Sequence, residues 1–179
     1  MLAGSVCLAK AQKEPLATAF AVPVDTITNL ITYEKVIEVQ GVSAAVIYKR
    51  INEWFQTYFV NPAEVIREND SVKFVIAAKP RFRLTNISSK DGAKTESGAV
   101  QYSITVSARE GRYKYELTAF NWKQQSYYPS EKWMDTKAKT FLPIYNDYLQ
   151  QLDKYSLETI NSLKNAVAHE KAVKDKDKW

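Results

Sequence analysis

The sequence predicts an α+β fold in which one antiparallel sheet of five strands carries helices on a single face, in the order β-α-β-β-β-β-α. Residues 100–108 and 112–122 alternate apolar and polar side chains, which is typical of strands with one buried and one wettable face. Aromatic and aliphatic residues recur at helical spacing in 44–60. With 179 residues, 45% of them hydrophobic and 25% charged, the chain suits one compact domain, which we place at 30–125.

The first residues do not show the pattern of the sheet. Residues 1–11 are a short apolar run ending in Ala9-Lys10-Ala11, a small-x-small pattern typical of signal-peptidase cleavage, and are interpreted as the remnant of a signal peptide. Cys7 is an alternative site of lipid attachment. Residues 12–29 contain two prolines and are predicted to be a linker or arm. The expected location is the periplasm or cell envelope. No later segment approaches the roughly 20 uninterrupted apolar residues of a membrane span.

The first half of the domain is predicted to hold a strand, a helix and a hairpin. Residues 33–40 are rich in Val, Ile and Tyr and form the first strand, and Ser43 caps the helix that follows. After Asn61-Pro62 we expect strands at 63–68 and 71–78, joined at Asn69-Asp70. Residues 85–98 contain few large apolar side chains and are predicted to be an exposed connection.

The second half is predicted to hold the alternating hairpin and a helical region. In its last strand Tyr113, Tyr115, Leu117 and Ala119 are expected to face the core, whereas Phe120 and Trp122 fall in the opposite, mostly polar row. Ser130 is expected to cap a helical region over 130–168 that Pro143 divides, and residues 169–179 to fray. A near-heptad row from Tyr145 to Val167 packs on the domain or on another chain.

Three phrases carry a resemblance to a known family: Tyr33–Val39, Trp54-Phe55 in the first helix, and Gly111–Tyr115 at the start of the last strand. Over roughly Leu30 to Trp122 the chain resembles a family of uncharacterised secreted bacterial proteins described as having a TBP-like fold. The resemblance implies the topology and export from a Gram-negative cell. It implies no chemistry, and the fold does not by itself transfer DNA binding.

The residue types needed by most cofactor and metal enzymes are scarce. Cys7 and His169 are the only cysteine and histidine, and neither a Gly-rich phosphate loop nor a nucleophile motif is found. We therefore predict no cofactor, no metal site and no catalytic residue. The net charge of +5 is spread among acidic residues without a basic stripe, which argues against nucleic-acid binding.

Two groups of residues are candidate ligand or partner surfaces. Lys79, Arg81 and Arg83 alternate around Pro80, so they form either an anion-binding patch or the protected edge of the sheet. The second group is aromatic, and its members either bind a sugar or peptide or pack beneath the final helix. They are Trp122, Tyr127, Tyr128 and Trp133.

These observations predict a non-enzymatic exported protein that binds a protein partner or a small ligand through its sheet surface or its C-terminal helix. One alternative is an envelope hydrolase that uses carboxylates and hydroxyls alone, for which Glu34 and Glu38 share a face of the first strand. Another is a structural protein that forms homo-oligomers through the C-terminal helix.

Overall fold

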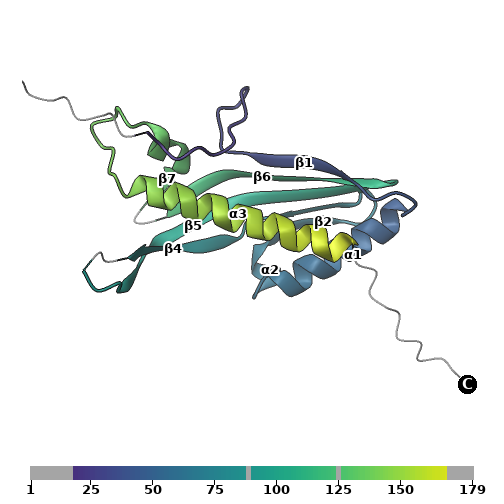
Figure 1. Cartoon of the computed structure of the whole chain (residues 1–179). Helices are drawn as coiled ribbons and strands as arrows, with labels where there is room; N and C mark the ends of the chain where they lie inside the picture. Colours follow the sequence, from purple (N-terminus) through teal and green to yellow (C-terminus); the bar gives the residue numbers. More distant parts are fainter. Residues whose placement is uncertain (1–17, 88–89, 124–125, 169–179) are drawn as a thin grey trace, which may run out of the picture.

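The computed structural model describes residues 18–87, 90–123 and 126–168 of the chain (Figure 1). In this part, seven strands form one antiparallel sheet, which confirms the α+β class and adds two strands to the expected five. The strands are β1 (Tyr33–Glu38), β2 (Ile66–Asp70), β3 (Val75–Ala78), β4 (Arg81–Ile87), β5 (Lys94–Arg109), β6 (Arg112–Lys123) and β7 (Tyr127–Pro129). The helices are α1 (Ala44–Tyr58), α2 (Pro62–Val65), the 3-10 helix η1 (Ser130–Met134) and α3 (Tyr145–Ala168).

The long hairpin of β5 and β6 forms the centre of the sheet. Its two-residue turn ends at Gly111, whose φ of 68° is a conformation that glycine adopts without steric cost. β1 and β7 share the outer side of β6, opposite residues 112–117 and 121–123 respectively. β3 and β4 share the outer side of β5 in the same way, and β2 pairs with β3 at the far edge. The result is a long sheet whose two flanks are each interrupted once.

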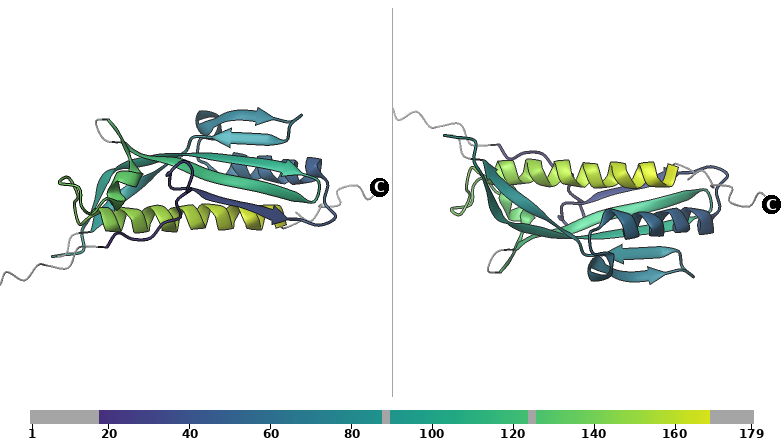
Figure 2. Two further views of the ribbon diagram at one scale, coloured as in Figure 1. Left: turned by 90° about the horizontal axis from the view of Figure 1, so that it is seen from above. Right: turned by 90° about the horizontal axis from the view of Figure 1, so that it is seen from below.

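One face of the sheet is covered by α1 and α3, which lie side by side in both views of Figure 2. The two helices are joined directly, because the Trp54 indole N–H donates to the Ser162 hydroxyl at 3.0 Å and the Arg50 guanidinium donates to the Val167 carbonyl at 2.9 Å. Their apolar side chains are buried against the alternating row of β5, as the sequence predicts. The near-heptad row of α3 therefore lies in the core of its own chain, and self-association through it would require α3 to leave the sheet.

A β-bulge near the end of β6 overturns the predicted facing of its last residues. The pairing with β5 slips between Gln101 and Ser103, and Ala119 adopts a positive φ of 55°. The extra residue reverses the alternation, so Phe120 is fully buried and Trp122 is half-buried on the helix side. The expectation that both belong to the wettable row was wrong.

The predicted hairpin at 63–78 is displaced along the chain. Pro62 starts a single helical turn, α2, instead of a strand, because its fixed φ suits the first position of a helix. The turn between β2 and β3 occupies 71–74, where the Asp70 carboxylate accepts hydrogen bonds from the backbone N–H groups of Val72 at 2.9 Å and Lys73 at 2.8 Å. Val72, which was expected in a strand, is 87% exposed in this turn.

Two predicted connections also differ from the structure. Residues 85–98 were expected to be a loop, but β4 and β5 continue through much of this region and pair through polar residues such as Thr85 with Glu96. No apolar row marks them because this end of the hairpin carries mostly exposed side chains. After Ser130 only η1 forms, and α3 begins at Tyr145, two residues after Pro143.

Candidate functional site

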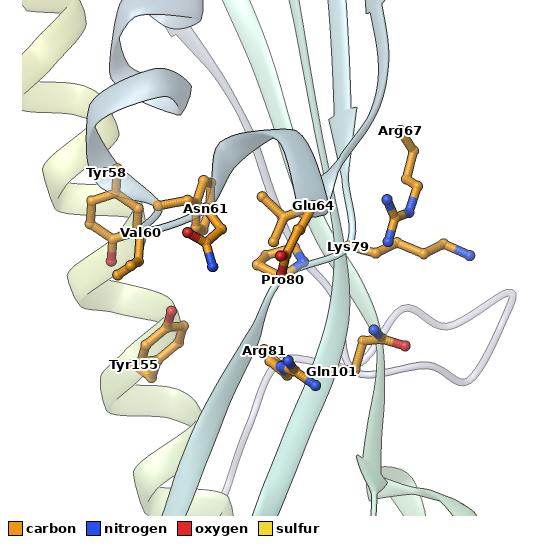
Figure 3. Close-up of a pocket in the computed structure, with 12 residues that line it drawn as sticks. Tyr58, Val60, Asn61, Glu64, Arg67, Lys79, Pro80, Arg81, Gln101 and Tyr155 are labelled. Carbon is orange, nitrogen blue, oxygen red and sulfur yellow. The ribbon is translucent and has the colours of Figure 1, made fainter.

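A pocket of about 570 Å³, here called the corner pocket, lies where β3 gives way to β4 (Figure 3). The chain is held on both sides of this break: the Lys79 N–H donates to the Val65 carbonyl at 2.8 Å, and the Pro80 carbonyl accepts from the Tyr102 N–H at 3.1 Å. The end of α1, α2 and α3 complete the walls. The lining residues are Tyr58, Phe59, Val60, Asn61, Glu64, Val65, Arg67, Lys79, Pro80, Arg81, Gln101 and Tyr155.

One side of the corner pocket is cationic. Arg67 from β2, Lys79 from the break and Arg81 from β4 are exposed; Arg67 and Lys79 lie on the right in Figure 3, and Arg81 lies below Pro80. None of the three forms an ion pair with any residue in the part of the chain that the structure describes. Glu64 is the one carboxylate of the lining, so positive charge prevails there. Such an arrangement attracts an anion.

The opposite side carries two phenol groups. The Tyr58 hydroxyl shares a hydrogen bond of 3.0 Å with the Thr159 hydroxyl, and the Tyr155 ring stacks on Phe82 at a centroid distance of 4.2 Å. Burial, followed by the neighbouring Tyr58, raises the pKa of Tyr155, so this hydroxyl stays protonated at neutral pH. Behind it, the Tyr102 hydroxyl is buried near Tyr155 without a well-aligned hydrogen bond. The pocket thus offers hydroxyl donors opposite its cations.

The predicted cationic patch is divided by the structure. Lys79 and Arg81 line the corner pocket, but Arg83 points elsewhere and pairs with Glu96 at 2.7 Å, where its side chain is 78% exposed. Arg67 and Tyr155 were missed because they come from β2 and α3, far from Lys79 in the sequence. The only local signal was Pro80 between two cations, which marked a break in a strand.

The predicted aromatic group is also divided. Trp133 is fully buried, and Tyr127 is 55% exposed. Trp122 and Tyr128 are half-buried and line a second pocket of about 1010 Å³, here called the aromatic cleft. Burial of Trp133 means that it supports the cleft from beneath instead of forming its surface.

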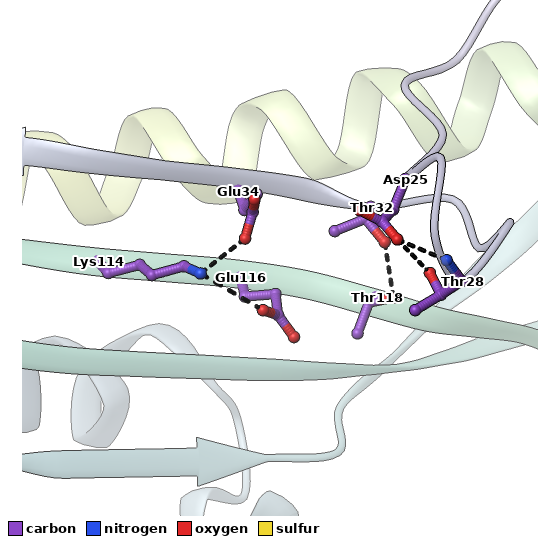
Figure 4. Close-up of polar contacts among 7 residues, drawn as sticks. All are labelled: Asp25, Thr28, Thr32, Glu34, Lys114, Glu116 and Thr118. Atoms are coloured by element: carbon purple, nitrogen blue, oxygen red, sulfur yellow. Dashed lines mark hydrogen bonds and ion pairs between the residues drawn. The ribbon is translucent and has the colours of Figure 1, made fainter.

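The outer face of the sheet mixes charges and hydroxyl groups (Figure 4). Glu34 pairs with Lys114 at 2.7 Å, and Glu116 lies 3.9 Å from the same ammonium group. Thr32 and Thr118 share a hydrogen bond of 2.9 Å. This part of the outer face therefore carries both acidic and basic side chains.

Several predicted features fall outside the described residues, including Cys7, His169, the segment 1–11 and the tail 169–179. Within 18–87, 90–123 and 126–168, no group of three or more His, Cys, Asp or Glu side chains is placed to hold a metal ion. Over the same ranges, no helix combines the length and apolar character needed to cross a membrane.

The sheet order, with helices on one face, defines an α+β protein of the TBP-like class. The chain belongs to the family described as a domain of unknown function (DUF4468) with TBP-like fold, which matches residues 33–123. A TBP-like protein from Parabacteroides distasonis is similar in structure, with a TM-score of 0.67 and 13% identity over 84% of this chain and 99% of that one. A DUF4468 family protein from Bacteroides ovatus gives a TM-score of 0.63 and 17% identity over 83% and 92%. No curated protein matches the sequence.

Proposed function

We propose that this chain is a non-enzymatic, exported binding protein of the cell envelope that holds a small anionic ligand in the corner pocket. The observation that carries the proposal is a set of three cations, Arg67, Lys79 and Arg81, which have no ion-pair partner within the described residues and line the same concave site as two tyrosines. Several positive side chains around one concave site attract an anion.

The tyrosine side narrows the ligand class. Tyr58 and Tyr155 offer ring surface and hydroxyl groups but no charge, so the body of the ligand should be a ring or a hydroxyl-bearing group. Its anionic end, a carboxylate or a phosphate, should lie toward Lys79 and Arg81. Arginine binds either group through paired N–H donors.

The test uses phenyl phosphate and benzoate as probes and phenol as the uncharged control, with binding followed by NMR chemical shifts and thermal stabilisation. We expect either anion to bind at least about tenfold more tightly than phenol, and the two anions distinguish phosphate from carboxylate recognition. At 100 times its dissociation constant, the bound anion should stabilise the fold by about 2.7 kcal/mol. If phenol binds as tightly as both anions, or nothing binds, the proposal is wrong.

Arg81 and Arg83 lie two residues apart on β4, and Lys79 lies in the break before this strand. Arg81→Gln combined with Lys79→Gln should weaken anion binding by about tenfold or more, whereas Arg83→Gln should leave it unchanged because Arg83 lies outside the pocket. Binding should also weaken as ionic strength rises. If the two variants lose anion affinity equally, the loss comes from the lower net charge of the protein and not from the corner pocket.

Export is supported by the small-x-small pattern at Ala9-Lys10-Ala11. Fractionation of native cells with an antibody to the chain is the direct test. We expect the protein in the periplasmic or membrane fraction, and its recovery with the cytosolic proteins would contradict this part of the proposal.

A further inference from the structure

We propose that the aromatic cleft is a second, independent binding site and that its ligand is a neutral carbohydrate. The cleft is lined by residues of β6, β7, η1 and the segment between η1 and α3, and by Tyr145, the first residue of α3. Its lining residues are Trp122, Ser126, Tyr128, Lys132, Asp135, Ala138, Thr140 and Tyr145.

The walls of the cleft supply aromatic surface at right angles. The Trp122 and Tyr128 rings have centroids 6.2 Å apart and an interplanar angle of 89°, and Tyr145 lies 6.5 Å from Tyr128. Both Trp122 and Tyr128 retain exposed surface. A sugar ring has an apolar face of C–H groups and a rim of hydroxyls, so it can lie on one aromatic face while its hydroxyls reach polar groups.

The polar groups of the cleft favour a ligand without net charge. Lys132 and Asp135 contribute one positive and one negative charge, and Thr140 adds a hydroxyl. The two charges offset each other for any ion, whereas a sugar hydroxyl can donate to Asp135 and accept from the Lys132 ammonium group, which lies 5.1 Å from the centroid of the Tyr128 ring. The corner pocket has the opposite balance, with three cations to one carboxylate. The two pockets are therefore suited to different ligand classes.

The aromatic walls are fixed before any ligand arrives. The Trp122 indole N–H donates to the Ser97 carbonyl at 2.8 Å, which sets the plane of its ring. Trp133 lies beneath, stacked on Tyr145 at a centroid distance of 6.0 Å and an interplanar angle of 29°. Rings held in this way lose little conformational entropy when a ligand binds. A few contacts can then give measurable affinity.

An aromatic peptide is the competing occupant, because tyrosine and tryptophan side chains also pack on aromatic walls. The charge pair favours the sugar, because a sugar carries several hydroxyl groups around one ring that can donate to Asp135 or accept from Lys132, whereas a tyrosine side chain carries one hydroxyl.

The experiment titrates the full chain with the neutral disaccharides maltose, cellobiose and N,N′-diacetylchitobiose, and with an uncharged tyrosine-containing tripeptide. Tryptophan fluorescence and the NMR signal of the Trp122 indole report on the cleft. We expect at least one disaccharide to give a saturable change in both signals. No saturable change with any sugar, or tighter binding of the tripeptide, would overturn the proposal.

Adjacent tyrosines provide the control. Tyr128→Ala should weaken sugar binding by about tenfold or more, and Tyr127→Ala should not change it, because Tyr127 is exposed and lies outside the lining. Asp135→Asn tests the polar contact without removing a ring, and it should also weaken binding. The assigned site is wrong if Tyr127→Ala and Tyr128→Ala weaken sugar binding equally. It is also wrong if neither Asp135→Asn nor Tyr128→Ala weakens sugar binding.

The corner pocket variant separates this proposal from the proposed function. The Lys79→Gln and Arg81→Gln double variant should bind the disaccharide as tightly as the unchanged protein. If it loses sugar binding while Tyr128→Ala retains it, the sugar occupies the corner pocket and the assignment to the aromatic cleft is wrong.

Discussion

Replacing Gly98 by alanine is expected to destabilise the protein through Trp122 as well as through the backbone. Gly98 lies in β5 with a φ of 84°, a left-handed conformation that alanine rarely adopts. A Cβ atom at this position would lie 2.9 Å from the Lys123 carbonyl oxygen and 2.9 Å from the Trp122 indole nitrogen. The backbone oxygen cannot easily move, so the indole or the strand must shift.

The magnitude follows from three contributions. The left-handed conformation costs alanine about 1–2 kcal/mol, and reduced freedom of the unfolded chain returns about 0.4–1 kcal/mol. Displacement of Trp122 adds about 1 kcal/mol for its hydrogen bond to Ser97. The expected loss is therefore about 2 kcal/mol. Gly111→Ala is the matched control, because Gly111 also has a positive φ, of 68°, but no atom lies within 4 Å of the methyl carbon that alanine would add. Its expected loss of stability is only about 1 kcal/mol.

Urea unfolding followed by circular dichroism measures both variants, and the Trp122 indole resonance reports the local shift. We expect Gly98→Ala to cost more than Gly111→Ala and to move this resonance, while the control leaves it in place. Equal losses of stability with an unchanged indole signal would refute the claim that Gly98 is needed for the close approach of Trp122.

Three further predictions concern the core and the bulge. Tyr33→Phe should lower the free energy of unfolding in urea by about 1–3 kcal/mol because it removes a 2.8 Å hydrogen bond to Asp153. Tyr102→Phe should lower it less, because the buried Tyr102 hydroxyl has no well-aligned partner. A larger loss of stability at Tyr102 than at Tyr33 would contradict this explanation. Burial, followed by the neighbouring Tyr115, raises the pKa of Tyr113 to about 12, so the protonated Tyr113 contributes its full stabilisation below about pH 10, the pKa of the unfolded chain, and this stabilisation is lost as pH rises through 12. Far-ultraviolet circular dichroism, recorded together with tyrosinate absorbance at 295 nm, should show unfolding in this window. Titration of every tyrosine near pH 10 without unfolding would exclude this prediction. Ala119→Gly should stabilise the protein by up to about 1 kcal/mol because glycine relieves the positive φ of 55°, and a loss of stability in thermal unfolding would count against a strained bulge.

The regular parts of the fold could be predicted because each follows a simple period. The alternation in 100–108 identified β5, and the helical stripe with its Ser43 cap identified α1, whose Ser43 hydroxyl accepts a hydrogen bond from the Val46 N–H at 3.4 Å. β7 and the polar end of β5 escaped prediction because their pairing depends on a neighbouring strand and leaves no apolar row in the sequence. β4 was also not among the predicted strands, although Phe82 and Leu84 alternate toward the core.

The bulge did leave a signal that the alternation alone obscured. Leu117 and Phe120 are both fully buried yet lie three residues apart, an odd spacing that a regular strand cannot place on one face. A bulky apolar pair at odd spacing in an otherwise alternating strand therefore indicates an inserted residue. The candidate sites were harder, because Arg67, Lys79 and Tyr155 meet only after three separate elements have packed.

Both pockets lie where the sheet departs from a regular ladder. Pro80 interrupts the flank of β5 and leaves Lys79 and Arg81 at the corner pocket, while the bulge at Ala119 turns Trp122 toward the aromatic cleft. A regular strand would have kept Trp122 on the outer face and joined β3 directly to β4. Irregularities of this kind cost stability. Because both occur at concave sites, we infer that they were selected for binding and not for folding alone. Regularising the bulge should therefore affect the sugar site while leaving the anion site intact.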